Sequence, residues 1–305
     1  MGITRREFLI GMTTTFGGAL TVGLSGCGGN GGESPGALAQ STRLTVGTQQ
    51  FEFGSTGSVF LLERENHDVV ALNANGTQRF RIVGRPFTGA GDLNYPVALA
   101  QSDSGLIYVL SKGGSRVHVY QSNGQPSFVF GGFGNGPGQF SYPSDLVIDR
   151  AGNLFVTDSF NHRIDKFTAD GGYVQSIGSF GLNGAGLNAP KGIDLDAFGL
   201  LHVTDSGNFR VSVFQTTGQY LYSYGSRGSG PGQFKSLIAL AIAPTGIVYV
   251  ADAVAGKILM FDNAGRYLAQ ISPQMADGTP ALPVALAYSP SDTLMVKGLP
   301  GRSGS

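Results

Sequence analysis

The sequence predicts an all-β fold, and three observations support this. Glycine recurs every 47 residues, at Gly84, Gly131, Gly178 and Gly225. Each repeat contains four short runs with a two-residue alternation, separated by turns, and no segment carries a convincing helical period. A four-stranded repeat of about 40 to 50 residues is typical of a propeller blade, which buries both faces only when it packs on neighbours in a ring. The sequence therefore predicts a β-propeller with four-stranded antiparallel blades.

The elements follow one order in every repeat. In the repeat that begins at Gly131, a first strand follows Pro143, and LFVTD forms the second strand after Gly152. The third strand begins at a cation, Arg163, and YVQSIG forms the fourth after Gly171. Pairs of first and second strands occur six times, at about 49–63, 97–110, 144–157, 191–204, 238–251 and 284–297. We therefore expect six blades.

The last blade runs out after its second strand. The segment Leu44–Gly47 at the other end of the chain is left over, so we expect it to supply a strand to that blade. Closure of this kind ties the termini together and covers a sheet edge. The expected propeller spans residues 43–298, with a tail over 299–305.

The first 27 residues have the pattern of an export signal. Arg5 and Arg6 precede Phe-Leu and a short apolar run, which resembles a twin-arginine signal, with Ile10 where that family usually has Lys. The segment Leu24-Ser-Gly-Cys27 resembles the lipobox of bacterial lipoproteins. This resemblance implies that Cys27 becomes the lipidated N-terminus of a membrane-anchored protein on the periplasmic or cell-surface side. The alternative is that Cys27 is an ordinary surface cysteine.

A Gly/Ser-rich stretch over residues 28–42 reads as a flexible linker between this anchor and the propeller. Cys27 is the only cysteine of the chain, so no intramolecular disulfide can form and the fold must depend on burial.

Two stretches resemble NHL repeats. They are GNGPGQFSYPSDLVIDRAGNLFVTDSFNHRIDKF at 134–167, and GSGPGQF at 228–234 followed by VYVADAVAGKILMFDNAGRY at 248–267. The triplet Asn161-His162-Arg163 that names the family occurs once. The resemblance implies a six-bladed propeller, but NHL domains occur in enzymes, sensor kinases, RNA-binding proteins and scaffolds, so it leaves the function open.

Charge and motifs argue against three kinds of function. The formal net charge is zero and no Lys/Arg-rich run is present, so nucleic-acid binding is not expected. The four histidines, His67, His118, His162 and His202, fall at positions that do not suggest three converging zinc ligands. No Gly-x-Ser-x-Gly elbow is present either, so a catalytic nucleophile is not evident.

The first candidate site is the central channel. We expect the middle residue of each first strand to face the core, and its two neighbours to face the channel. The core set is Phe51, Leu99, Leu146, Ile193, Leu240 and Leu286. The neighbours are mostly Ala and Gly, with three carboxylates, Glu52, Asp145 and Asp194. Such carboxylates could hold a divalent cation or bind a cationic or hydroxylated ligand, or they could simply be solvated by channel water.

The second candidate is the cation that begins each third strand. The set is Arg116, Arg163, Arg210 and Lys257. Asp158, Asp205 and Asp252 lie five residues before the last three, so Asp–Arg pairing or capping of loop amides is expected. The alternative is a cationic ring on the loop face that meets an anionic polymer.

Two functional hypotheses follow. The first is a non-catalytic, monomeric propeller that binds an envelope protein, a peptide or a glycan and has no evident cofactor. The second is a metal-dependent hydrolase, lactonase or lyase that uses the channel carboxylates, with a divalent cation as its cofactor.

Overall fold

The computed structural model describes residues 43–47, 50–54, 58–73, 76–85, 92–289 and 292–301. The expected export signal and linker, with Arg5, Arg6 and Cys27, lie outside this range. Within the described part of the chain, no helix is long and apolar enough to cross a membrane.

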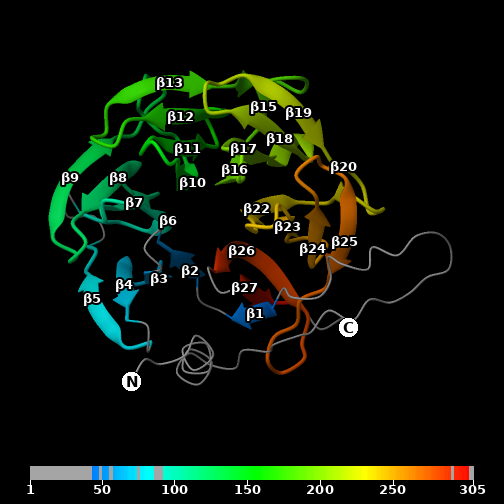
Figure 1. Ribbon diagram of the computed structural model, residues 1–305, viewed down its shortest axis with the longest axis horizontal. Coiled ribbons are helices and arrows are strands. Elements are labelled where there is room, and N and C mark those ends of the chain that lie inside the picture. The colour runs from blue at the N-terminus through cyan, green and yellow to red at the C-terminus, as the bar shows by residue number, and fades with distance from the viewer. Residues whose placement is uncertain are drawn as a thin grey trace.

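The chain folds into a ring of sheets around a central channel (Figure 1). Among the described residues, five sheets have four antiparallel strands each, hydrogen-bonded in chain order. The first contains β2 (Gln50–Phe53), β3 (Val59–Glu63), β4 (Asp68–Leu72) and β5 (Gln78–Ile82), and the second β6 (Pro96–Gln101), β7 (Ile107–Ser111), β8 (Arg116–Tyr120) and β9 (Pro126–Gly131). The third contains β10 (Pro143–Ile148), β11 (Leu154–Asp158), β12 (Arg163–Phe167) and β13 (Tyr173–Ile177).

The next two sheets repeat this order. The fourth contains β16 (Pro190–Leu195), β17 (Leu200–Asp205), β18 (Arg210–Gln215) and β19 (Tyr220–Tyr224). The fifth contains β22 (Leu237–Ile242), β23 (Val248–Asp252), β24 (Lys257–Phe261) and β25 (Tyr267–Ile271). The first strand of each sheet lies against the channel, so we call it the inner strand.

The sixth sheet joins the two ends of the chain. It contains β26 (Ala281–Ser289), β27 (Thr293–Pro300) and β1 (Arg43–Gly47), in the order β1-β27-β26. The first strand of the chain therefore completes the last blade, as the sequence predicted. It runs parallel to β27, whereas the third strand of every other blade is antiparallel to the second. The last strand ends at Pro300, two residues beyond the expected end of the propeller.

Short ribbons connect successive blades on one face of the ring. They are β14 (Ser179–Phe180) with β15 (Gly186–Leu187), β20 (Ser226–Arg227) with β21 (Gln233–Phe234), and the single bridge between Phe133 and Phe140. A 3-10 turn, η1 (Ser206–Asn208), lies between β17 and β18. We call this side, where the connections between blades and the β11–β12 type turns gather, the loop face.

The recurring glycine lets each connection pack tightly. Gly131 and Gly225 have φ values of 88° and 84°, a left-handed conformation that favours glycine. A Cβ atom at these positions would come within 2.6 Å of Phe140 and 2.4 Å of Phe234, both fully buried. The 47-residue glycine period therefore marks the point where an apolar side chain of the connection inserts into the core.

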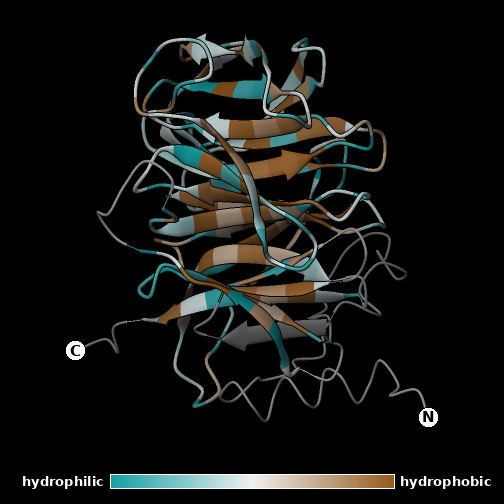
Figure 2. Cartoon of the chain, turned by 90° about the vertical axis from the view of Figure 1, so that its left-hand side faces the viewer, coloured by the Kyte–Doolittle hydropathy of each residue, from teal (hydrophilic) through white to brown (hydrophobic). Residues whose placement is uncertain are grey.

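The core consists of layers between neighbouring blades, and Figure 2 shows the apolar residues concentrated in the strands. Leu99 packs with Phe60 of the preceding blade, whereas Ala98 and Ala100 pack with Leu146 of the following blade. The two neighbours of Leu99 were expected to face the channel. Ala100 does line the channel cavity, but Ala98 does not, and Leu99 lines it as well. The expected alternation was therefore wrong at Ala98, because successive side chains point to the two neighbouring blades. The edge of the inner strand, with its backbone groups, is what faces the channel.

Candidate functional site

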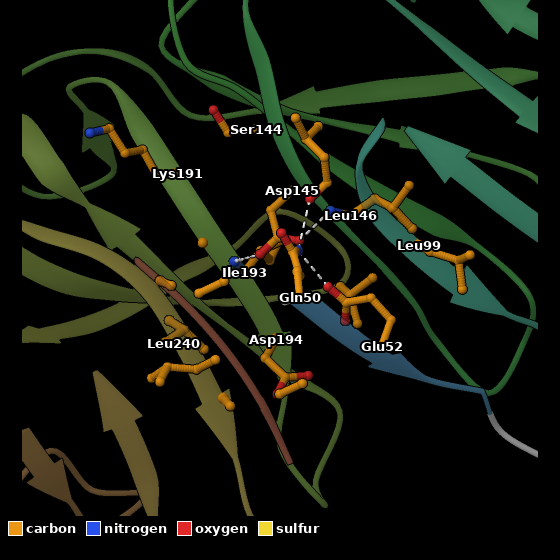
Figure 3. Close-up of a pocket in the computed structure, with 18 of the residues that line it drawn as sticks. Gln50, Glu52, Leu99, Ser144, Asp145, Leu146, Lys191, Ile193, Asp194 and Leu240 are labelled. Carbon is orange, nitrogen blue, oxygen red and sulfur yellow. Dashed lines mark hydrogen bonds between the residues drawn. The ribbon is translucent and has the colours of Figure 1, made fainter. Parts of the chain in front are cut away.

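The central channel contains a cavity of about 530 Å³. Inner strands of all six blades line it, and Figure 3 shows this region in close-up. Glu52 on β2, Asp145 on β10 and Asp194 on β16 all line this cavity. The structure thus brings together the three carboxylates that the sequence placed in the channel.

Two of these carboxylates bind backbone amides on both oxygens. Asp145 accepts hydrogen bonds from Leu146 N at 2.9 Å and from Ile193 N at 3.0 Å. Asp194 accepts from Leu195 N at 2.8 Å and from Ile242 N at 2.8 Å. In each case the second amide belongs to the inner strand of the next blade.

These bonds follow from the position of the inner strands. An inner strand has an unpaired edge, and its backbone groups there require partners. Gln50 supplies one from the first blade, where its Nε2 donates to the Val97 carbonyl of the next inner strand at 3.0 Å. A polar side chain reaching forward from one blade therefore satisfies the exposed edge of the next. As a neighbour of Phe51, Gln50 was expected only to line the channel, although it shares the repeat position of Asp145.

Burial shifts the titration of all three acids. The pKa of Glu52 is raised to about 8, first by burial and then by the charge of Asp145. Burial also raises the pKa of Asp145 to about 7 and that of Asp194 to about 6, against the backbone hydrogen bonds that favour their charged forms. Glu52 accepts a hydrogen bond from Gln50 Nε2 at 2.8 Å. A channel at neutral pH therefore holds a mostly protonated Glu52.

The three acids do not form a ready cation site. Within the part of the chain that the structure describes, no group of three or more His, Cys, Asp and Glu side chains lies close enough to hold a metal ion.

The loop-face arginines hold the connections between blades. Arg163 donates to the carbonyls of Asn135, Gly136 and Gln139, and its Nε lies 3.1 Å from Asp165 and 3.7 Å from Asp158.

Arg210 repeats this arrangement one blade on. It donates to the carbonyls of Gly184 and Gly186 and pairs with Asp205 at 2.8 Å. Asp158 and Asp205 also accept backbone amides of these connections, from Ser141 and Asn188. The pairing and amide capping expected from the sequence are present for both arginines.

The other two cations differ. Lys257 donates to Gln270 of β25 at 3.2 Å on the exposed surface. Arg116 lies near the buried His118, whose pKa is lowered to about 4 by burial and by the Arg116 charge.

Two histidines link consecutive blades. His67 and His162 have positive φ values, and their Nδ1 atoms accept the amides of Tyr95 and Ala189, the residues just before the next inner strands. Asn161 beside His162 donates to the Gly134 carbonyl and to Asp158. The Asn-His-Arg triplet therefore joins its turn to the connections on both sides.

Three cationic side chains at the mouth of the channel were not predicted from the sequence. Arg64, Lys112 and Lys191 line the cavity together with Tyr142 and Ser144. The Lys112 ammonium lies 3.3 Å from the centre of the Tyr142 ring. These residues come from four different blades. Arg64 and Lys112 share one repeat position, the residue just after the second strand, but Ser159 and Ser206 occupy it in the next two blades. Lys191 has no cationic counterpart in the other blades, so the repeat alone does not reveal the group.

An aromatic surface lies beside this mouth on the loop face. It comprises Phe133, Tyr142, Phe160, Phe180 and Leu182, with exposed fractions of 79, 45, 62, 66 and 63%. Tyr142 and Phe160 stack with ring centres 4.6 Å apart, and Phe180 contacts the His162 ring at 4.9 Å.

The ring of sheets and its central cavity define a β-propeller. The chain belongs to the family described as 6-bladed beta-propeller, whose model matches residues 94–183 and 194–276. No curated protein matches the sequence of this chain.

Solved structures of similar fold include both enzymes and a binding protein. A streptogramin B lyase is 16% identical with a TM-score of 0.62, over 81% of this chain and 75% of that one. A gluconolactonase from Xanthomonas campestris is 14% identical with a TM-score of 0.59, over 82% and 84%. A chain of a nidogen/laminin complex is 16% identical with a TM-score of 0.57, over 82% and 86%. At these identities the similarity establishes the fold alone.

Proposed function

We propose that this propeller is a non-catalytic binding module that docks an envelope protein, a peptide or a glycan on its loop face. The observation that carries this proposal is the aromatic surface. Exposed apolar groups gathered on one face mark interaction sites, because burying them against a partner removes a large apolar area from water.

The loops that carry this surface are held in place before any partner binds. Asn161 and Arg163 fix the 133–141 connection, as described above, and Phe160 N donates to the Ser141 carbonyl at 3.0 Å. On the next connection, Asn208 donates to the Gly181 carbonyl at 2.9 Å. A surface ordered in this way loses little conformational entropy on binding, which favours a recognition role.

The test compares two sets of exposed aromatic residues. The combined variant Phe133→Ala, Phe160→Ala and Phe180→Ala removes the surface, and Phe198→Ala, 76% exposed in the turn between β16 and β17 at the opposite end of the blades, is the matched control. The purified propeller is immobilised and exposed to envelope proteins and to envelope glycans in separate arms. We expect the triple variant to lose a partner that the wild type and the control retain. Equal retention by all three would refute the proposal.

The proposal includes the NHL character of the repeats and an exported, lipid-anchored location. The lipobox-like segment ending at Cys27 and the twin-arginine-like Arg5 and Arg6 support it. Metabolic labelling with a palmitate analogue should mark the wild-type chain and not Cys27→Ala. Equal labelling of the two would remove the anchor from the proposal.

One observation favours a second candidate, a hydrolase, lactonase or lyase that acts in the channel with a divalent cation. Strongly perturbed acids in a cleft are frequent at catalytic sites, and Glu52, Asp145 and Asp194 share one cavity with raised pKa values. Elemental analysis of the purified chain and a lactone-hydrolysis assay, each repeated with Glu52→Gln, test this candidate. Stoichiometric metal and turnover that both vanish in the variant would favour it over the binding module.

A further inference from the structure

The mouth of the channel gathers three cations that form no ion pair with the described residues. Arg64 lies just after β3, Lys112 just after β7, and Lys191 is the second residue of β16. All three line the central cavity. None of them forms an ion pair within 4.0 Å with any residue that the structure describes.

The fold does not require a charge at the Lys112 position, although Arg64, at the same position in the first blade, donates from Nη2 to the Val97 carbonyl at 3.3 Å. Ser159 and Ser206 occupy the repeat position of Lys112 in the next two blades. Each serine donates its hydroxyl to the inner strand of the following blade, to the carbonyls of Pro190 and Leu237. A small hydroxyl is therefore sufficient to join blades at this position, and the lysine has no structural need to be there.

The cations are also partly removed from water. Burial lowers the pKa of Lys191, and the nearby Lys112 lowers it further while Tyr142 raises it. The Arg64 Nε is buried and makes no hydrogen bond with the described residues. An unsatisfied buried donor is costly, and an anion beside it would remove that cost.

Lys112 and Lys191 both act on Tyr142, and the Lys112 Nζ lies 3.3 Å from the centre of its ring. Lys112 is the largest cause that lowers the pKa of the Tyr142 hydroxyl, and the charge of Lys191 lowers it further. The carboxylates deeper in the cavity act on this group only at a distance. Burial raises the pKa of Glu52 and Asp145 and the Arg64 charge opposes this rise, but no carboxylate of the described residues lies within 4.0 Å of the three cations.

We propose that the channel mouth binds a small organic anion, whose acid group is held by Lys112, Lys191 and Arg64 and whose body enters the cavity. A cavity of about 530 Å³ is within the usual size range of small-molecule sites. The acid group can be a carboxylate or a phosphate, since both offer the oxygen acceptors that ammonium and guanidinium groups bind. This site extends the proposed function, because a partner docked on the aromatic surface is bound by different residues.

The test is a calorimetric titration of the purified chain at pH 7 and low ionic strength, with citrate in one arm and inorganic phosphate in the other. We expect citrate, phosphate or both to bind with a stoichiometry of one per chain. The anion with the higher affinity identifies the acid group that the site prefers. Affinity should fall about tenfold for each lysine removed in Lys112→Met and Lys191→Met, and should weaken as NaCl is added.

The matched control is Lys257→Met, which removes a lysine on the third strand of its blade, away from the channel. It should leave the affinity unchanged. Lys112→Arg should restore most of the affinity that Lys112→Met loses, and this rescue separates a charge effect from a folding defect.

Two outcomes would overturn the proposal. One is that neither anion shows saturable binding. The other is that the variant carrying both Lys112→Met and Lys191→Met binds the anion with the affinity of the wild type. Neither outcome bears on whether a partner binds to the aromatic surface, because the phenylalanine variants test that binding separately. The two proposals can therefore fail separately.

Discussion

Asp145 and Asp194 explain why carboxylates lie in a channel wall that is otherwise rich in alanine. Each accepts one amide of its own strand and one amide from the inner strand of the next blade. Charged acceptors make stronger hydrogen bonds than neutral ones, so these two residues fasten three consecutive blades at the channel.

We predict that Asp145→Ala lowers the free energy of unfolding by about 1 to 3 kcal/mol, because two amides lose a charged acceptor. Urea unfolding of the purified chain measures this. Glu52→Ala is the comparison, because its carboxyl accepts a side-chain hydrogen bond from Gln50 and ties no neighbouring blade through a backbone amide. An equal loss in the two variants would contradict the role given to Asp145.

Glu52 should instead control how stability depends on pH. Its pKa is raised from 4.5 to about 8 in the folded chain, so the folded state holds a proton that the unfolded state has released. Stability therefore falls as pH rises from about 4.5 to about 8, and it levels off above that range. Asp145 and Asp194 act in the same direction at lower pH, because their pKa values are raised to about 7 and about 6.

The measurement is the thermal unfolding midpoint between pH 6 and pH 9. We predict that the unfolding midpoint of the wild type falls across this range. The midpoint of Glu52→Gln should fall less, because the glutamine side chain has no carboxyl proton to release. Glu65→Gln, an exposed acid in the turn after β3, should follow the wild type. Parallel curves for Glu52→Gln and the wild type would show that the Glu52 proton does not affect stability.

At the level of elements, the turn between the second and third strands has one demanding position. The residue just before the third strand adopts a left-handed conformation in five successive blades. These residues are His67, Ser115, His162, Phe209 and Gly256, with φ between 50° and 63°. Two histidines offset the strain by accepting an amide of the next blade. Gly256 adopts the conformation without strain.

We predict that Gly256→Ala lowers the free energy of unfolding by about 1 kcal/mol through backbone strain alone, since a Cβ there would make only an ordinary 3.6 Å contact with Leu282. Ser115→Gly should change stability in the opposite direction, because it relieves the same strain. Chemical unfolding of both variants checks the pair. An unchanged free energy of unfolding in Gly256→Ala would show that the turn relaxes to accommodate the alanine.

For the whole molecule, stability depends on closing the ring. The parallel pairing of β1 with β27, from Arg43 opposite Thr293 to Gly47 opposite Lys297, connects the start of the chain to its last blade. In Figure 1 the blue β1 lies beside the red β27. Loss of this pairing would expose the edge of β27 and leave the first and last blades joined only by the packing of β2 on β26 and β27.

We predict that a chain beginning at residue 48 unfolds at least about 5 °C below one beginning at residue 43, because a loss of a few kcal/mol shifts a domain of this size by roughly that amount. Thermal unfolding of the two purified chains measures the difference. Identical midpoints would show that β1 contributes nothing to closure.

Part of this architecture could be predicted because it is encoded locally. A strand, its turn and the glycine that admits Phe140 or Phe234 all lie within one repeat, so the period and the alternation reveal them. The closing strand at Leu44–Gly47 was also predictable, because the last blade visibly lacked strands. The same local logic indicated that Asp158 and Asp205 would pair with Arg163 and Arg210.

The partners of the channel residues could not be predicted in this way. Ile193 and Ile242 lie 48 residues from the aspartates that bind their amides. The two meet only because one blade's side chains point at the next blade, and the same geometry turns Ala98 away from the channel cavity it was expected to line.

By itself the sequence determined the strands, the blades and the way the ring closes, since each depends on neighbours in the chain. Tertiary structure alone decided what the channel contains. In the folded ring, backbone amides bind Asp145 and Asp194, and burial raises the pKa of Glu52. Lys112, Tyr142 and Lys191 come from three blades and meet at the mouth of the channel. The physical reason is that contacts at the axis of a ring depend on how separate repeats are turned toward one another, and no single repeat records that.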